Sequence, residues 1–72
     1  MHLTINGKPR ELELNGADEI DLPTLLERFD INPRLVAVAI NGDVIPKTDY
    51  ASAKVHAGDA LEIVRMVGGG AR

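Results

Sequence analysis

The spacing of apolar residues changes twice along this chain, and that change is the strongest constraint on its fold. Residues 3–5 and 12–14 alternate apolar and polar side chains, as strands with one buried face do. Residues 22–29 carry leucine and phenylalanine at helical spacing, and residues 36–40 return to a strand-like pattern. Strands on both sides of one helix predict an α+β fold, in which the helix packs on one face of a sheet.

The first two strands are expected to form an antiparallel hairpin. Asn6-Gly7 follows the first strand and is a dipeptide that tight hairpin turns favour. The second strand is predicted at Leu12-Glu13-Leu14, where the alternation resumes. Because Pro9 has no N–H to donate to a ladder, we place it in the turn or at the start of the second strand.

A short amphipathic helix is predicted from residue 22 onward. Asp21 can cap its start with Pro23 in the first turn, where the missing N–H is not needed; alternatively, Thr24 and Glu27 have capping-box spacing for a later start. Asn32-Pro33 is expected to end the helix. The apolar stripe consists of Leu22, Leu25, Leu26 and Phe29, and the preceding acidic residues Asp18, Glu19 and Asp21 are interpreted as a solvated segment that complements the positive N-terminal end.

The second half of the chain is read as strands joined by turns. Residues 36–40 are almost unbroken in apolar character, which favours a strand near the sheet centre or covered on both sides. Asn41-Gly42 turns this strand back into Val44-Ile45, which Pro46 ends. Lys47 to Lys54 is expected to be irregular, with one helical turn around Tyr50. After the turn at Ala57-Gly58-Asp59, the last strand is predicted at Ala60–Val67.

This order of elements predicts a β-grasp fold: a mixed sheet of four to five strands packed on one helix. In that fold the last strand lies inside the sheet, between strands that are distant in sequence. We predict a folded domain over residues 1–67 and a flexible glycine tail over residues 68–72, because Gly68-Gly69-Gly70 lose too much backbone entropy on ordering to join a strand unaided.

Composition excludes several functions. A chain of 72 residues forms one domain with no room for a deep private cavity. The absence of cysteine removes disulfides, thiolate nucleophiles and thiolate metal sites. A formal net charge of −3 and 3% aromatic residues argue against nucleic acid as a partner. No window has the roughly 20 apolar residues that a membrane span requires, so we predict a cytoplasmic protein without a membrane partner.

The side chains also give no sign of catalysis. His2 and His56 lie far apart and have none of the spacings that zinc sites use, so they are interpreted as structural or solvated histidines rather than ligands. No Ser-His-Asp set or pair of carboxylates is recognisable. We therefore predict a protein that is not an enzyme and holds no metal.

Several segments in order resemble the ThiS family of ubiquitin-like sulfur carrier proteins. The resemblance covers nearly the whole chain and rests on the order and spacing of the segments relative to the glycine end, since each segment alone is common. The segments are Val38-Ala39-Ile40-Asn41-Gly42-Asp43, Val44-Ile45-Pro46, Tyr50, Ala57-Gly58-Asp59, Leu61-Glu62-Ile63-Val64 and Val67-Gly68-Gly69-Gly70.

The resemblance implies a carrier for thiazole formation in thiamine biosynthesis. An E1-like adenylyltransferase would use ATP to activate Gly70, a sulfur donor such as a cysteine desulfurase system would convert it to a thiocarboxylate, and thiazole synthase would receive the sulfur. No cofactor would be bound by the carrier itself. Gly68 and Gly69 would thread the partner channels, and Arg65, Met66 and Val67 are candidate partner contacts; alternatively, Met66 belongs to the core.

One departure from the family concerns the end of the chain. Family members commonly finish at the glycines, whereas this chain continues through Ala71 and Arg72. A protease removes these two residues, or activation tolerates them, or the chain is not a working carrier; we favour removal. Two other functions with the same fold stay open, namely the small subunit of molybdopterin synthase and a ubiquitin-like protein modifier. A plain interaction module is a third alternative.

Overall fold

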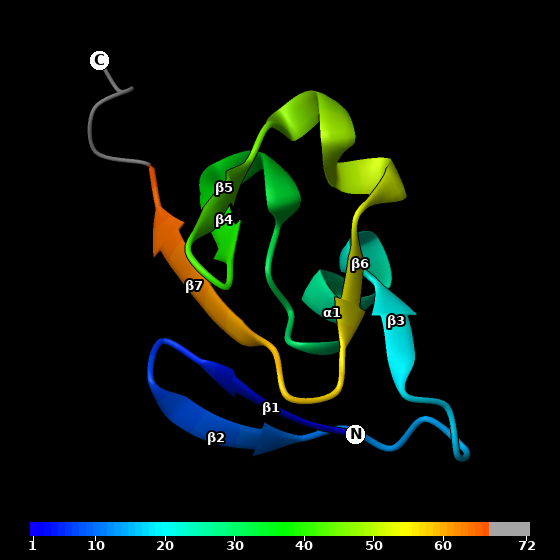
Figure 1. Ribbon diagram of the computed structural model, residues 1–72. Coiled ribbons are helices and arrows are strands. Elements are labelled where there is room, and N and C mark those ends of the chain that lie inside the picture. Colours follow the sequence, from blue (N-terminus) through cyan, green and yellow to red (C-terminus); the bar gives the residue numbers. More distant parts are fainter. Residues whose placement is uncertain (67–72) are drawn as a thin grey trace.

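The computed structural model describes residues 1–66 and contains a mixed five-stranded sheet with strand order β2-β1-β7-β4-β5 (Figure 1). Strands β1 and β7 are parallel, and the other neighbours are antiparallel. The last strand therefore lies between strands distant in sequence, which confirms the predicted β-grasp arrangement. The strands are β1 (His2–Ile5), β2 (Lys8–Glu11), β4 (Val36–Ile40), β5 (Asp43–Ile45) and β7 (Ala60–Arg65).

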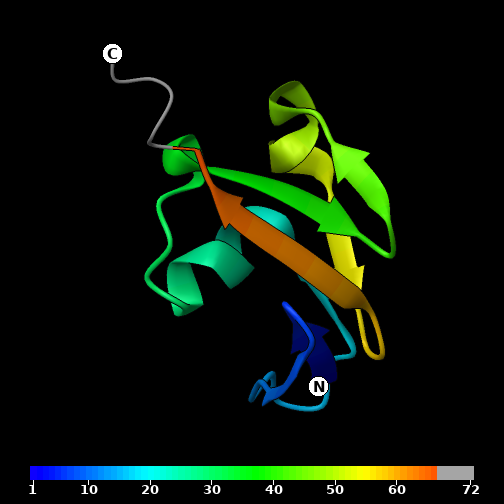
Figure 2. The ribbon, with the colours of Figure 1, turned by 90° about the vertical axis from the view of Figure 1, so that its left-hand side faces the viewer.

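Helix α1 (Leu22–Arg28) packs on one face of this sheet (Figure 2). Leu22, Leu25 and Leu26 are fully buried, as the predicted stripe requires, and Phe29 is half-buried beside them. Burying a leucine side chain contributes about 1.5–3 kcal/mol, so these residues account for much of the attachment of the helix to the sheet. The sheet supplies Leu3, Ile5, Val36, Val38, Leu61 and Ile63 to the same core.

Both ends of α1 are satisfied by local hydrogen bonds. The Asp21 carboxylate accepts the Thr24 N–H at 3.1 Å and also the Thr24 hydroxyl, which confirms Asp21 as the N-cap; these hydrogen bonds lower the pKa of Asp21. The prediction that Asn32-Pro33 ends the helix is wrong. A Schellman motif ends it earlier, with Asp30 at φ +61° and the Ile31 N–H bonded to the Leu26 carbonyl at 2.8 Å.

The first hairpin has the predicted turn but a different second strand. Asn6 and Gly7 both have positive φ, as a type I′ turn requires. The pairing begins directly after the turn, so β2 contains Pro9 opposite Thr4 and ends before Leu12. Because β2 is an edge strand, the missing N–H of Pro9 need not leave a ladder bond unmade. Leu12 is buried from the connecting loop rather than from a strand.

A second, two-stranded sheet was not predicted. Strand β3 (Glu19–Asp21) pairs with β6 (Lys54–His56), so Lys54 is not irregular and Glu19 and Asp21 lie in a strand. Asp18 and Glu19 are exposed, in keeping with their interpretation as solvated residues. Each strand has a single buried apolar residue, Ile20 and Val55, which is too few to show alternation. Two short 3-10 helices, η1 (Pro33–Leu35) and η2 (Lys47–Ser52), complete the fold; η2 contains the predicted helical turn at Tyr50.

The remaining predictions concern the turns in the second half of the chain, the end of β7 and the residues after it. The turns at Asn41-Gly42 and Ala57–Asp59 are confirmed. Strand β7 ends at Arg65, so Met66 follows it rather than belonging to it. Val67, the domain boundary placed there and the glycine tail lie outside the described residues. No helix within residues 1–66 is long and apolar enough to span a membrane.

Candidate functional site

The described residues end at Met66, directly after β7. The Met66 N–H donates to the Leu35 carbonyl at 2.8 Å, which ties the residue after the strand to η1. The Ala60 carbonyl accepts the Asn41 N–H just beyond β4, so the even-numbered residues of β7 bond toward β4. The backbone N–H and C=O of Arg65 therefore point to the other edge of β7. Strand β1 pairs with β7 only as far as Leu61, so it leaves that edge open at Arg65.

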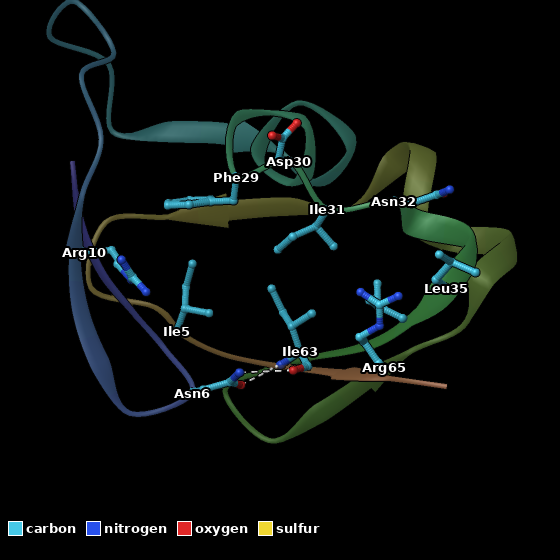
Figure 3. Close-up of a pocket in the computed structure, with 11 residues that line it drawn as sticks. Ile5, Asn6, Arg10, Phe29, Asp30, Ile31, Asn32, Leu35, Ile63 and Arg65 are labelled. Atoms are coloured by element: carbon cyan, nitrogen blue, oxygen red, sulfur yellow. Dashed lines mark hydrogen bonds between the residues drawn. The ribbon is translucent and has the colours of Figure 1, made fainter. Parts of the chain in front are cut away.

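Asn6 extends the pairing between the first hairpin and β7. Its backbone N–H donates to the Leu61 carbonyl at 2.8 Å. Its side-chain oxygen accepts the Ile63 N–H at 2.8 Å, and its side-chain amide donates to the Ile63 carbonyl at 3.1 Å (Figure 3). The carboxamide thus takes the place of a strand residue and fixes the direction of β7 near its end. The sequence assigned Asn6 only to a turn, and no signal in it indicated this bond.

The face of the sheet away from α1 carries exposed apolar side chains. On β7 the odd residues Leu61 and Ile63 face the core, so Val64 lies on the open face, where it is 57% exposed. Val44 on β5 is 74% exposed, and Met66 is 47% exposed. Ala37 and Ala39 lie opposite Val64 and Val44 in the ladder and continue this surface. We call these five residues the open-face patch; sequence alone could not select them.

The two predicted contact residues within the described part lie next to each other but are directed differently. Met66 is exposed rather than part of the core. Arg65 follows Ile63 on the side of the sheet that faces the helix, and its guanidinium points into a groove there (Figure 3). The predicted sites at Val67, Gly68, Gly69 and Gly70 lie outside the described residues.

The histidines take part in exposed polar pairs. His2 Nδ1 lies 2.9 Å from Glu11 Oε1, and His56 Nε2 lies 3.2 Å from Glu19 Oε1. Hydrogen bonds from His2 and from the N-terminal ammonium lower the pKa of Glu11. Within residues 1–66, no three His, Asp or Glu side chains gather closely enough to hold a metal ion.

Comparison with known proteins identifies relatives along almost the whole chain. The ThiS family matches residues 3–70. A protein named thiazole synthase from Paramagnetospirillum magneticum is 40% identical over 70 residues, which are 97% of this chain but only 20% of that protein. An uncharacterized protein, ycf40 of Pyropia yezoensis, is 37% identical and is covered over 90% of its length, against 94% of this chain.

A solved structure agrees with the fold. The crystal structure of thiamine biosynthesis protein ThiS from Geobacter metallireducens superposes with a TM-score of 0.81 at 34% identity, covering 97% of this chain and 100% of that one. The family match spans far more than half of the chain. The chain therefore belongs to the ThiS family and is a sulfur carrier of thiamine biosynthesis with the β-grasp fold of that family.

Proposed function

We propose that this protein carries sulfur as a thiocarboxylate on Gly70 and delivers it for thiazole formation. The observation that carries this assignment is the extent of the family match, which ends at Gly70 and leaves out Ala71 and Arg72. Removal of these two residues makes the Gly70 carboxylate the terminus. The residues before it, Gly68 and Gly69, have no side chains that would hinder passage through a narrow channel.

The chemistry requires an activating partner. An α-carboxylate has a pKa of about 3.3–3.7, so it is ionised at neutral pH and is a poor electrophile. Attack of its oxygen on the α-phosphorus of ATP releases pyrophosphate and forms an acyl adenylate. A persulfide sulfur then displaces AMP to give an acyl disulfide, which an external thiol reduces to the thiocarboxylate. An E1-like adenylyltransferase supplies the first step, and a cysteine desulfurase system supplies the sulfur. The carrier acts as a co-substrate, and we place it in the cytoplasm with these enzymes.

In this proposal the folded domain docks on the partner enzyme, and the tail enters the active site. From Val67 to Gly70 the extended chain reaches about 14 Å at roughly 3.4 Å per residue, enough for the terminus to enter an active site while the domain stays outside. The open-face patch, with Val64 and Met66 directly before the tail, provides an apolar surface on which the receiving enzyme docks. Thiazole synthase is the proposed acceptor, in keeping with the relative that bears that name.

ATP–pyrophosphate exchange by the E1-like enzyme of the same organism tests the proposal. Three chains are compared: the full chain, a chain ending at Gly70, and a chain ending at Gly70 from which Gly68 and Gly69 are deleted. The chain ending at Gly70 is expected to support exchange and, with a sulfur donor, to gain the mass of one sulfur in place of one oxygen. Equal sulfur transfer by the glycine-deleted chain would exclude the proposed route.

A further inference from the structure

The groove beside the end of β7 arises because α1 is shorter than the sheet it covers. The helix ends at Arg28, and beyond it only the loop that begins at Phe29 lies over the sheet. The resulting cavity has a volume of about 510 Å³, within the range of ligand sites. Ile5 and Ile63 form one wall, and Phe29 and Ile31 face them from the helix side (Figure 3). The two facing walls are therefore apolar, while polar and charged side chains complete the lining.

Two arginines on different strands point into this groove from opposite ends (Figure 3). Arg10 lies on β2 opposite Leu3, and its Cζ atom is 5.9 Å from the centroid of the Phe29 ring. Arg65 lies on β7 opposite Val36. Neither guanidinium forms an ion pair with any residue in 1–66. Asp30 lies at the rim, with its carboxylate directed away from the groove (Figure 3).

This arrangement selects for negative charge next to an apolar group. The chain as a whole has a net charge of −3, whereas two positively charged side chains surround this groove. Arg10 and Arg65 are both exposed in the free chain, so a carboxylate bound there gains strength only as the bound segment itself excludes water from the apolar walls beside it. The open N–H and C=O of Arg65 add a backbone pairing site at the same end of the groove.

We propose that the groove binds an extended acidic segment of the protein that receives the tail, with an apolar side chain between Phe29 and Ile63 and carboxylates on Arg10 and Arg65. This proposal rests on the proposed function, because the tail must be handed to a partner. Arg65 lies two residues before Val67, so a protein that takes the tail along β7 passes the mouth of the groove. With the open-face patch on the other side, the partner holds the end of β7 from both faces.

The first test is an NMR titration of the full chain with the peptide acetyl-Glu-Leu-Phe-Glu-amide and with its glutamine analogue. The acidic peptide is expected to shift the resonances of Ile5, Phe29, Ile31 and Ile63, and to bind about tenfold more weakly to Arg10→Gln and to Arg65→Gln. Arg34→Gln removes the same charge from η1 without lining the groove, so it should leave the affinity unchanged.

Three results would overturn the proposal. The glutamine peptide binding as tightly as the acidic one would remove the role of the arginines. Shifts confined to the open-face patch would place the peptide elsewhere. Nuclear Overhauser contacts between the tail glycines and Phe29 in the free chain would make the chain's own tail the occupant.

A second test uses the receiving enzyme, thiazole synthase, with the thiocarboxylated carrier as its sulfur donor. Arg10→Gln and Arg65→Gln are expected to raise KM for the carrier about tenfold while kcat stays unchanged, because the groove contributes binding and not chemistry. An unchanged KM in both variants would refute the proposal that this enzyme occupies the groove during sulfur transfer. If the unsubstituted chain ending at Gly70 is not adenylated at all, the proposed function fails, and the peptide titration still decides whether the groove binds acidic segments.

Discussion

Replacing Asn6 should weaken the fold more than the same change at the second Asn-Gly turn. Both Asn6 and Asn41 have positive φ, and both side chains bond to β7. Asn6 makes two partly buried bonds to Ile63, whereas the bonds of Asn41 to Ala60 and Asp59 are exposed. Glycine tolerates positive φ, so Asn→Gly at either position removes the side-chain bonds without adding strain to the turn.

The expected losses follow from these bonds. A typical net contribution is about 1 kcal/mol per hydrogen bond, and an unsatisfied buried group costs about 1–3 kcal/mol. Asn6→Gly should therefore lower the free energy of unfolding by about 2–3 kcal/mol, including the added flexibility of glycine. For a domain of this size, that corresponds to about 8–24 °C in Tm. Asn41→Gly should lose about half as much, because water replaces its exposed partners.

Urea unfolding followed by circular dichroism measures both variants against the parent chain. Asn6→Asp adds a discriminating case: its carboxylate still accepts the Ile63 N–H, but its second oxygen faces the Ile63 carbonyl and repels it. It should be less stable than Asn6→Gly above the carboxyl pKa and recover as the carboxyl is protonated. Equal losses for Asn6→Gly and Asn41→Gly would refute the view that the Asn6 carboxamide holds the end of β7.

Three further predictions concern other parts of the molecule. Leu25→Ala, at a fully buried position in α1, should cost about 2–5 kcal/mol in urea unfolding; a smaller loss would mean that the helix is loosely packed. Hydrogen bonds from Thr24 lower the pKa of Asp21 from 3.8, so the ionised cap stabilises the fold above pH 3.8, and this stabilisation is lost as pH falls through the folded-state pKa. Asp21→Asn should therefore make the free energy of unfolding less dependent on pH in the acid range. An unchanged pH dependence would contradict the role of the Asp21 carboxylate. Val44→Asp, at a 74% exposed site, should leave Tm within a few degrees yet raise the KM of thiazole synthase for the thiocarboxylated carrier by about tenfold, whereas an unchanged KM would remove Val44 from the docking surface.

Much of the fold could be predicted because its longer elements carry regular patterns. The stripe from Leu22 to Phe29 indicated the helix, and the two Asn-Gly pairs indicated both hairpin turns. The position of β7 inside the sheet came from the fold type, not from pattern, since no local signal records which strands pair across the chain.

The errors have local physical causes. Strands β3 and β6 have three residues each with one buried side chain, so periodicity cannot reveal them. The helix ends in a Schellman motif with Asp30 at the left-handed position. Because glycine usually occupies that position, the end of the helix lacked its usual sequence signal. The proposed contact surfaces could be predicted only in part: Arg65 is named from its closeness to the tail, whereas Arg10 and Val44 enter the proposals only once the strand register is known.

The central claim is that Gly70 becomes the sulfur-bearing terminus, and the intact mass of the protein from its native host tests it most directly. Cells grown without thiamine should yield a chain that lacks Ala71 and Arg72, with part of the population heavier by the exchange of one oxygen for sulfur. A single full-length species that retains Arg72 under the same conditions would contradict the claim.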